Sequence, residues 1–122
     1  MRRAAAVALL LLFTACHEHH QAQAREAVLR HDLFEMRKAI TDFRADKKRG
    51  PHSLEELQSE RYLRTIPNDP ITQQANWRVT TEEVVRNDDF AGTSTAPREV
   101  EVVDVHSRAA GKDRNGKAYA DY

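Results

Sequence analysis

Apolar residues recur at a helical spacing between residues 21 and 48. Successive members lie four, three, four and three positions apart, which places them on one side of a helix whose other side is charged. The stripe consists of Leu29, Leu33, Met36, Ile40 and Phe43. A helix of about 28 residues is about 42 Å long, more than a small domain can bury, so we expect its first turns to project. The stripe also suits a coiled coil, although barely three heptads are present.

Basic residues and a Gly-Pro pair mark the end of this helix. Lys47, Lys48 and Arg49 suit the negative end of the helix dipole. Gly50 and Pro51 follow directly, and neither residue continues a helix readily. We therefore expect the helix to end at this pair.

Residues 53–70 connect the helix to the β-rich half of the chain. Ser53 and Glu56 have the spacing of a capping box, in which the serine oxygen accepts a backbone N–H group and the glutamate reaches back to the cap. A short helix is therefore predicted to begin there. Pro67 and Pro70 prevent any helical continuation, so an extended crossing is expected after it.

Two stretches of β-forming residues follow. The first, residues 76–85, shows partial alternation, and the second, residues 99–106, reads EVEVVDVH. The valines of the second stretch change phase after Val102, which indicates a bulge or a strand covered on both faces. Residues 87–97 have the composition of a loop, and residues 107–122 are expected to form an ordered loop or a last short strand. The predicted fold is α+β, a long N-terminal helix packed on a small antiparallel sheet.

The predicted core joins the helical stripe to this sheet. Leu33, Met36, Ile40 and Phe43 are expected to be buried by a sheet that contains Trp77, Val79, Val100 and Val102, with Val105 as a further candidate. Replacing one of these large side chains by alanine is expected to destabilise the fold strongly.

The N-terminus has the form of a bacterial signal peptide. Two arginines precede an apolar run from Ala4 to Phe13, which is shorter than the roughly 20 residues a bilayer crossing needs. The run ends in FTAC, which resembles a lipobox, so Cys16 is the predicted site of lipidation. The alternative is a cleaved secretory signal with a chance cysteine. Residues 1–15 are thus predicted to be a signal peptide, residues 16–24 a polar tether and residues 25–122 the folded domain.

Three histidines lie in the predicted tether. His17, His19 and His20 could hold a transition metal, because imidazole is its commonest protein ligand. A hydrophilic tether accounts for them more simply, since the tract has neither a C-x-x-C-H nor an H-E-x-x-H spacing.

Length and charge limit the function classes. A chain of 122 residues has room for one domain, and its 19 basic and 19 acidic residues cancel and are interspersed. No overall electrostatic argument for nucleic acid follows. A single cysteine also excludes a disulfide within the chain.

One local set of residues suggests a hydrolase. Asp104, His106 and Ser107 have the side chains of a nucleophilic triad. Neighbouring side chains on a strand point to opposite faces, which separates the histidine from the serine. His31 and His52 are interpreted as a solvated residue and a residue beside the helix cap. We therefore expect no enzymatic activity and no small-molecule substrate.

The order of these features resembles a known family. Residues 62–70 read YLRTIPNDP and residues 104–107 read DVHS, after a long helix and a strand with a tryptophan. From residue 25 to residue 122 the chain resembles the soluble part of the major pseudopilin of type II secretion systems, and type IV pilin-like proteins more widely. The resemblance implies a helix along a small antiparallel sheet and assembly into a periplasmic filament. Pseudopilins begin with a prepilin peptidase site and a long apolar stem, and in this chain the predicted lipid anchor takes the place of both.

The resemblance implies a non-enzymatic protein of the cell envelope. It is expected to face the periplasm from its lipid anchor and to act through protein partners in a secretion or pilus assembly. Alternatives are a stand-alone lipoprotein that binds or stabilises an envelope partner and, least favoured, a small hydrolase.

The same resemblance implies a calcium site in the tail. Ser107, Asp113 and Asp121 fall near the positions where the family carries its oxygen ligands. Calcium takes six to eight oxygens, so these three would be a partial set. Lys112 and Arg114 flank the central aspartate and would weaken a cation site. The alternative is a solvated loop whose aspartates favour turns.

Overall fold

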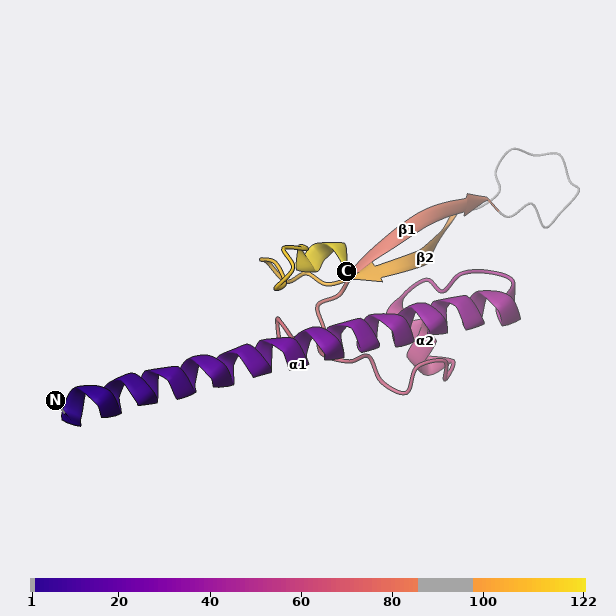
Figure 1. Ribbon diagram of the computed structural model, residues 1–122. Helices are drawn as coiled ribbons and strands as arrows, with labels where there is room; N and C mark the ends of the chain where they lie inside the picture. The colour runs from indigo at the N-terminus through magenta and orange to yellow at the C-terminus, as the bar shows by residue number, and fades with distance from the viewer. Residues whose placement is uncertain (1, 86–97) are drawn as a thin grey trace, which may run out of the picture.

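A long helix and a two-stranded antiparallel sheet dominate the molecule. The computed structural model describes residues 2–85 and 98–122, and side chains from residue 20 onward. The elements are helix α1 (Arg2–Lys47), helix α2 (Leu54–Ser59), strand β1 (Arg78–Val85), strand β2 (Arg98–His106) and the short 3-10 helix η1 (Tyr119–Asp121), as Figure 1 shows. The sheet lies along the C-terminal half of α1, which confirms the predicted α+β fold.

Helix α1 begins well before residue 21, the start that the apolar stripe predicts. The Ala- and Leu-rich run that precedes residue 21 also favours a helix. Within the described part of the chain, no helix combines the length and apolarity that a bilayer crossing needs. The predicted loop at residues 87–97 lies outside the described residues.

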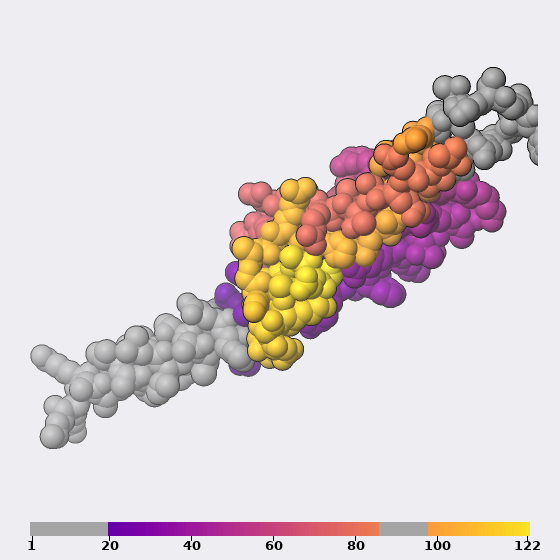
Figure 2. Space-filling model, turned by 90° about the horizontal axis from the view of Figure 1, so that it is seen from above, coloured from indigo at the N-terminus to yellow at the C-terminus, as the bar shows by residue number. Residues whose placement is uncertain are grey.

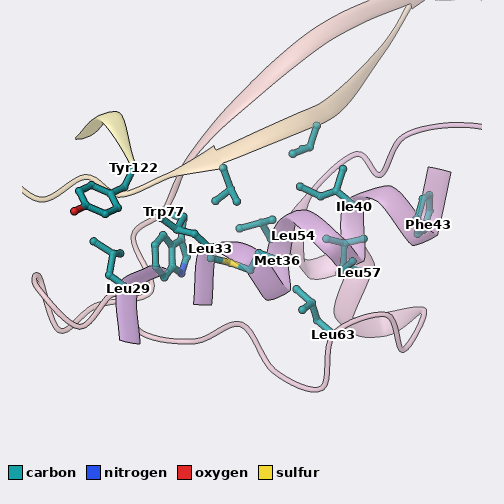
Figure 3. Close-up of a cluster of buried hydrophobic side chains, with 13 residues drawn as sticks. Leu29, Leu33, Met36, Ile40, Phe43, Leu54, Leu57, Leu63, Trp77 and Tyr122 are labelled. Atoms are coloured by element: carbon teal, nitrogen blue, oxygen red, sulfur yellow. The ribbon is translucent and has the colours of Figure 1, made fainter. Parts of the chain in front are cut away.

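The predicted stripe of α1 forms the core (Figure 3). All five of its members are buried, and Leu54, Leu57 and Leu63 from the α2 region cover them from one side. From the sheet side, Trp77, Val102 and Val105 are buried against the same stripe. The core thus lies between α1, α2 and strand β2.

Two of the predicted core valines are on the surface. Val79 is 39% exposed and Val100 is 47% exposed, so their assignment to the core was wrong. Every residue of β1 except Val84 is exposed, because this outer strand extends beyond the cover that α1 and α2 provide. Alternation along a strand predicts which residues share a face, but it does not predict how far the neighbouring helix reaches.

Strand β2 contains the predicted irregularity. The register of the two strands shifts between Thr80, which pairs with Asp104, and Thr81, which pairs with Val102. Val103 is therefore the extra residue of a β-bulge. The bulge lets Val102 and Val105 face the core together, although they are three positions apart.

Helix α1 ends three residues before the expected Gly-Pro pair. Its last residue is Lys47, and Lys48 takes the left-handed conformation with φ 59° that often closes a helix. Gly50 has a different use: its backbone N–H donates to Glu101 Oε2 at 2.6 Å. An added Cβ at Gly50 would lie 2.8 Å from the Cβ of Glu101, so the glycine permits a close approach between the helix end and β2.

The cap of α2 forms as predicted, with one difference. Ser53 Oγ accepts the backbone N–H of Glu56 at 3.3 Å. The glutamate accepts the N–H of His52, one residue before the cap, at 2.6 Å. Glu56 also bonds Arg49, and this bond lowers the pKa of its carboxyl although burial opposes the shift. These contacts tie the end of α1 to the start of α2.

Candidate functional site

The C-terminal tail, residues 107–122, folds back onto the middle of α1. Tyr119 donates its hydroxyl to Glu26 Oε1 at 3.3 Å, and Arg114 Nε lies 3.4 Å from Glu26 Oε2. Glu26 is only 2% exposed, so these two contacts partner a buried carboxylate. In Figure 1 the tail lies over the middle of α1, at the end of the sheet toward the N-terminal half of the helix, and in Figure 2 it packs directly against the described part of α1.

Asp113 organises the loop within this tail. Its Oδ1 accepts the backbone N–H groups of Asn115 and Lys117 at 2.8 and 2.9 Å. Its Oδ2 accepts the hydroxyl of Tyr122 at 2.5 Å. The bond from Tyr122 is the largest influence that lowers the pKa of this carboxyl, and burial opposes it. Asp113 therefore works as an ionised turn-former that also holds the last residue.

Ser107 belongs to a different hydrogen-bond network. Its hydroxyl donates to Asp69 Oδ2 at 2.5 Å and accepts the N–H of Ala109 at 3.0 Å. Asp69 is fully buried, and its other oxygen accepts the backbone N–H groups of Ile71 and Thr72. The serine thus fixes the start of the tail to the crossing that precedes β1.

The structure does not bring the three predicted calcium ligands into one network. Asp113 and Ser107 bond different partners, and Asp121 is exposed at the end of η1. Among the described residues, no group of three or more His, Cys, Asp or Glu side chains could hold a metal ion. Backbone oxygens supply many calcium ligands, so this geometry does not test the site, and it stays a prediction.

Of the three residues of the suggested triad, Asp104 and His106 contact each other, whereas Ser107 bonds elsewhere. Asp104 Oδ2 lies 3.2 Å from His106 Nε2, and its Oδ1 accepts Arg37 Nε at 2.7 Å. His106 Nδ1 lies 2.8 Å from the backbone oxygen of Tyr122. Ser107, the predicted nucleophile, bonds Asp69 and not this imidazole. The arrangement works as a link between α1, β2 and the tail.

The structure describes few contacts of the remaining histidines and none of the predicted lipidation site, Cys16. His31 is exposed, and His52 Nδ1 lies 3.0 Å from the carbonyl of Val100 at the edge of β2. His20 is exposed. Cys16, His17 and His19 precede the residues whose side chains the structure describes, so both predictions for the tether stay open.

Two structural residues of this region had been missed. Glu26 lies three positions before Leu29, in phase with the buried stripe, and this phase was the signal that could have identified it. Asp69 stands in the quoted PNDP motif without an assigned role, and the Asp-Pro pair is typical of a turn. No pattern along the chain pairs Asp69 with Ser107, which is 38 positions away.

A small hollow opens between α2 and the start of β1. Its volume is about 200 Å³. It is lined by His52, Ser53, Leu54, Glu55, Ile66, Ala75, Trp77 and Val79. Val79 lies at its edge, and on the same face of the sheet Val85 and Val100 are 52% and 47% exposed. This mixture of apolar and polar groups suits an inserted side chain better than a reactive centre.

Comparison with known proteins found no relative of this chain. No protein-family model matches the chain, and no match was found among curated proteins or solved structures.

Proposed function

We propose that the chain is a lipid-anchored, non-enzymatic, pseudopilin-like protein of the bacterial envelope that acts through protein contacts in a type II secretion or pilus-type assembly. The observation that carries this proposal is helix α1. Its C-terminal half bears the whole buried stripe, whereas every residue from 20 to 25 is exposed. A helix that packs a small head at one end and extends beyond it at the other is suited to hold that head away from a membrane.

Exposed apolar side chains support a role in protein contacts. Phe34 is 61% exposed and Val28 is 48% exposed on α1. On the sheet, Val79, Val85 and Val100 lie on one face, and Val79 also lines the hollow. An exposed aromatic side chain of this size is a common anchor in protein interfaces.

A stand-alone envelope lipoprotein is the second candidate. The observation that favours it is the apolar run from Ala4 to Phe13 before Cys16, which is shorter than the stem that the resemblance to pseudopilins would lead us to expect. Such a protein would bind or stabilise one envelope partner without entering a filament.

A photo-crosslinking amino acid at position 34 in the native host separates these candidates. The proposal expects an adduct with a component of a secretion or pilus assembly, and loss of secreted proteins when the gene is deleted. The same amino acid in place of Gln58, which is exposed on α2, is the matched control. An adduct with another envelope protein and undisturbed secretion would support the stand-alone lipoprotein.

The lipid anchor is tested by the intact mass of the protein purified from membranes. The proposal expects loss of the first fifteen residues and added acyl chains on Cys16. A mature protein that keeps Met1, or an unacylated one, would contradict the anchor whatever the crosslinking shows.

A further inference from the structure

The fold divides the side-chain charges between two parts of the molecule. The proximal part comprises residues 20–30 and 107–122, which the tail contacts bring together at Glu26. It has six basic and three acidic residues. The distal part comprises residues 31–85 and 98–106, with ten basic and thirteen acidic residues. A chain with no net charge thus has one basic and one acidic part.

Burial increases this difference at the surface. Two of the three proximal acids, Glu26 and Asp113, are 2% and 8% exposed and are bonded to tyrosine hydroxyls. Only Asp121 is an exposed acid there. All six proximal basic residues are exposed, namely Arg25, Arg30, Arg108, Lys112, Arg114 and Lys117. We call this surface the basic end.

The basic end lies on the side of the head that faces the predicted anchor. Ten helical residues separate Cys16 from Glu26, a rise of about 15 Å. Lys47, at the other end of α1, lies about 31 Å farther along the axis. Figure 1 shows the tail at the end of the sheet toward the N-terminal half of α1.

Distance and screening set the reach of these charges. The headgroup layer is about 5 to 7 Å thick on each side of a bilayer, and the Debye length is about 8 Å at physiological salt. An upright helix would hold the basic end about one to two Debye lengths above the headgroups. A tilt of α1 toward the tail would bring the basic residues into contact with them.

We propose that the basic end is a second membrane contact, which docks on anionic phospholipid headgroups of the membrane that holds the anchor. This inference rests on the proposed lipid anchor at Cys16. The anchor would keep the head close to the membrane, so even a modest attraction of the basic end to anionic headgroups would change how the head is held against it. Each basic residue near an anionic surface raises the docked population by about fivefold.

The test uses the full acylated chain with the substitution Ala110→Cys, at an exposed position in the tail. Cys16 is the only natural cysteine, so a maleimide fluorophore labels the tail alone when Cys16 is acylated. Energy transfer to an acceptor on lipid headgroups then reports docking. The chain is inserted in vesicles of phosphatidylcholine alone or with about 30% phosphatidylglycerol, at low salt and at about 0.5 M salt.

The expected transfer is higher in the anionic vesicles and falls at high salt. Lys112→Gln, which removes one charge, is expected to lower the ratio of docked to undocked head about fivefold, and Lys112→Glu, which changes the charge by two, about 25-fold. Arg61→Glu is the matched control, because it makes the same charge change in the distal part. Arg61 follows Glu60, which pairs with Lys47 at the far end of α1. Arg61→Glu is expected to leave the ratio unchanged. Melting curves identify any variant that fails to fold. If Lys112→Glu does not fold, Lys112→Gln takes its place in the comparison.

Two results would overturn the inference and leave the anchor in place. One is equal transfer in neutral and anionic vesicles, and the other is an equal effect of the Lys112 and Arg61 substitutions. Labelling of the wild-type chain would instead show a free thiol at Cys16. That outcome would remove the proposed anchor and, with it, the docking inference.

Discussion

The contact between Gly50 and Glu101 gives the sharpest prediction for stability. In Gly50→Ala the new Cβ would lie 2.6 Å from Glu101 Oε2 and 2.8 Å from Glu101 Cβ, closer than real Cβ atoms approach. The glutamate must move, which costs about 1 to 3 kcal/mol as overpacking. Its buried oxygen also loses the 2.6 Å bond from Gly50, about 1 to 3 kcal/mol more. Alanine also restricts the unfolded chain more than glycine does, which stabilises the folded state by about 0.4 to 1 kcal/mol.

We therefore expect Gly50→Ala to lower the free energy of unfolding by about 2 to 4 kcal/mol, or the melting midpoint by roughly 10 °C or more. Urea unfolding followed by the fluorescence of the single tryptophan, Trp77, measures it, because this side chain is only 6% exposed in the core. The control is Gly116→Ala, where φ is +83° and no atom lies within 4 Å of the new Cβ. That change costs only the backbone term of about 1 to 2 kcal/mol. Equal stability of Gly50→Ala and the wild type would refute the close approach.

Three further predictions test the core, the helix-sheet link and the tail. Ile40→Ala is expected to lower the free energy of unfolding by about 2 to 5 kcal/mol, because the side chain is 3% exposed. A thermal melt measures the loss, and a loss under about 1 kcal/mol would contradict the burial of Ile40. Arg37→Ala breaks an ion pair with Asp104 whose two side chains are each 40% exposed, so it is expected to cost under about 1 kcal/mol. Burial is the largest single influence on the pKa of Asp104 and raises it, but the bonds from Arg37 and the Val105 N–H, together with nearby positive charge, outweigh burial and lower the pKa. The stabilisation by ionised Asp104 is therefore present above the ordinary carboxyl pKa and is lost as pH falls through the lowered pKa. Asp104→Asn is thus expected to melt below the wild type at pH 7 and to converge with it in acid. Millimolar calcium is expected to raise the wild-type melting midpoint by mass action, and not that of the Asp113→Ala, Asp121→Ala double variant; an unchanged wild-type midpoint would remove the calcium site.

The main elements could be predicted because their signals are local. The stripe from Leu29 to Phe43 and the valine phase change in β2 report periods that a helix and a bulged strand must have. The exposure of Val79 and Val100 could not be predicted in this way. It depends on where α1 and α2 stop covering the sheet, which is a property of their packing.

The candidate site was harder to predict than the fold. Ser107 and Asp113 were selected by family resemblance, and their bonds to Asp69 and Tyr122 depend on contacts across the chain. The basic end is another such case. Its charges come from residues 20–30 and 107–122, which lie far apart in the sequence. The contacts of the tail with Glu26 bring these two segments together into one surface.

The contact between Tyr119 and Glu26 also limits when the head can fold. The two residues are 93 positions apart, so the buried carboxylate has no tyrosine partner until nearly the whole domain has emerged. Long loops close slowly, and the sheet likewise pairs strands from the late part of the chain. Helix α1 can therefore form early, while its buried stripe stays uncovered. A chain held at the membrane would need protection from aggregation until its last residues arrive.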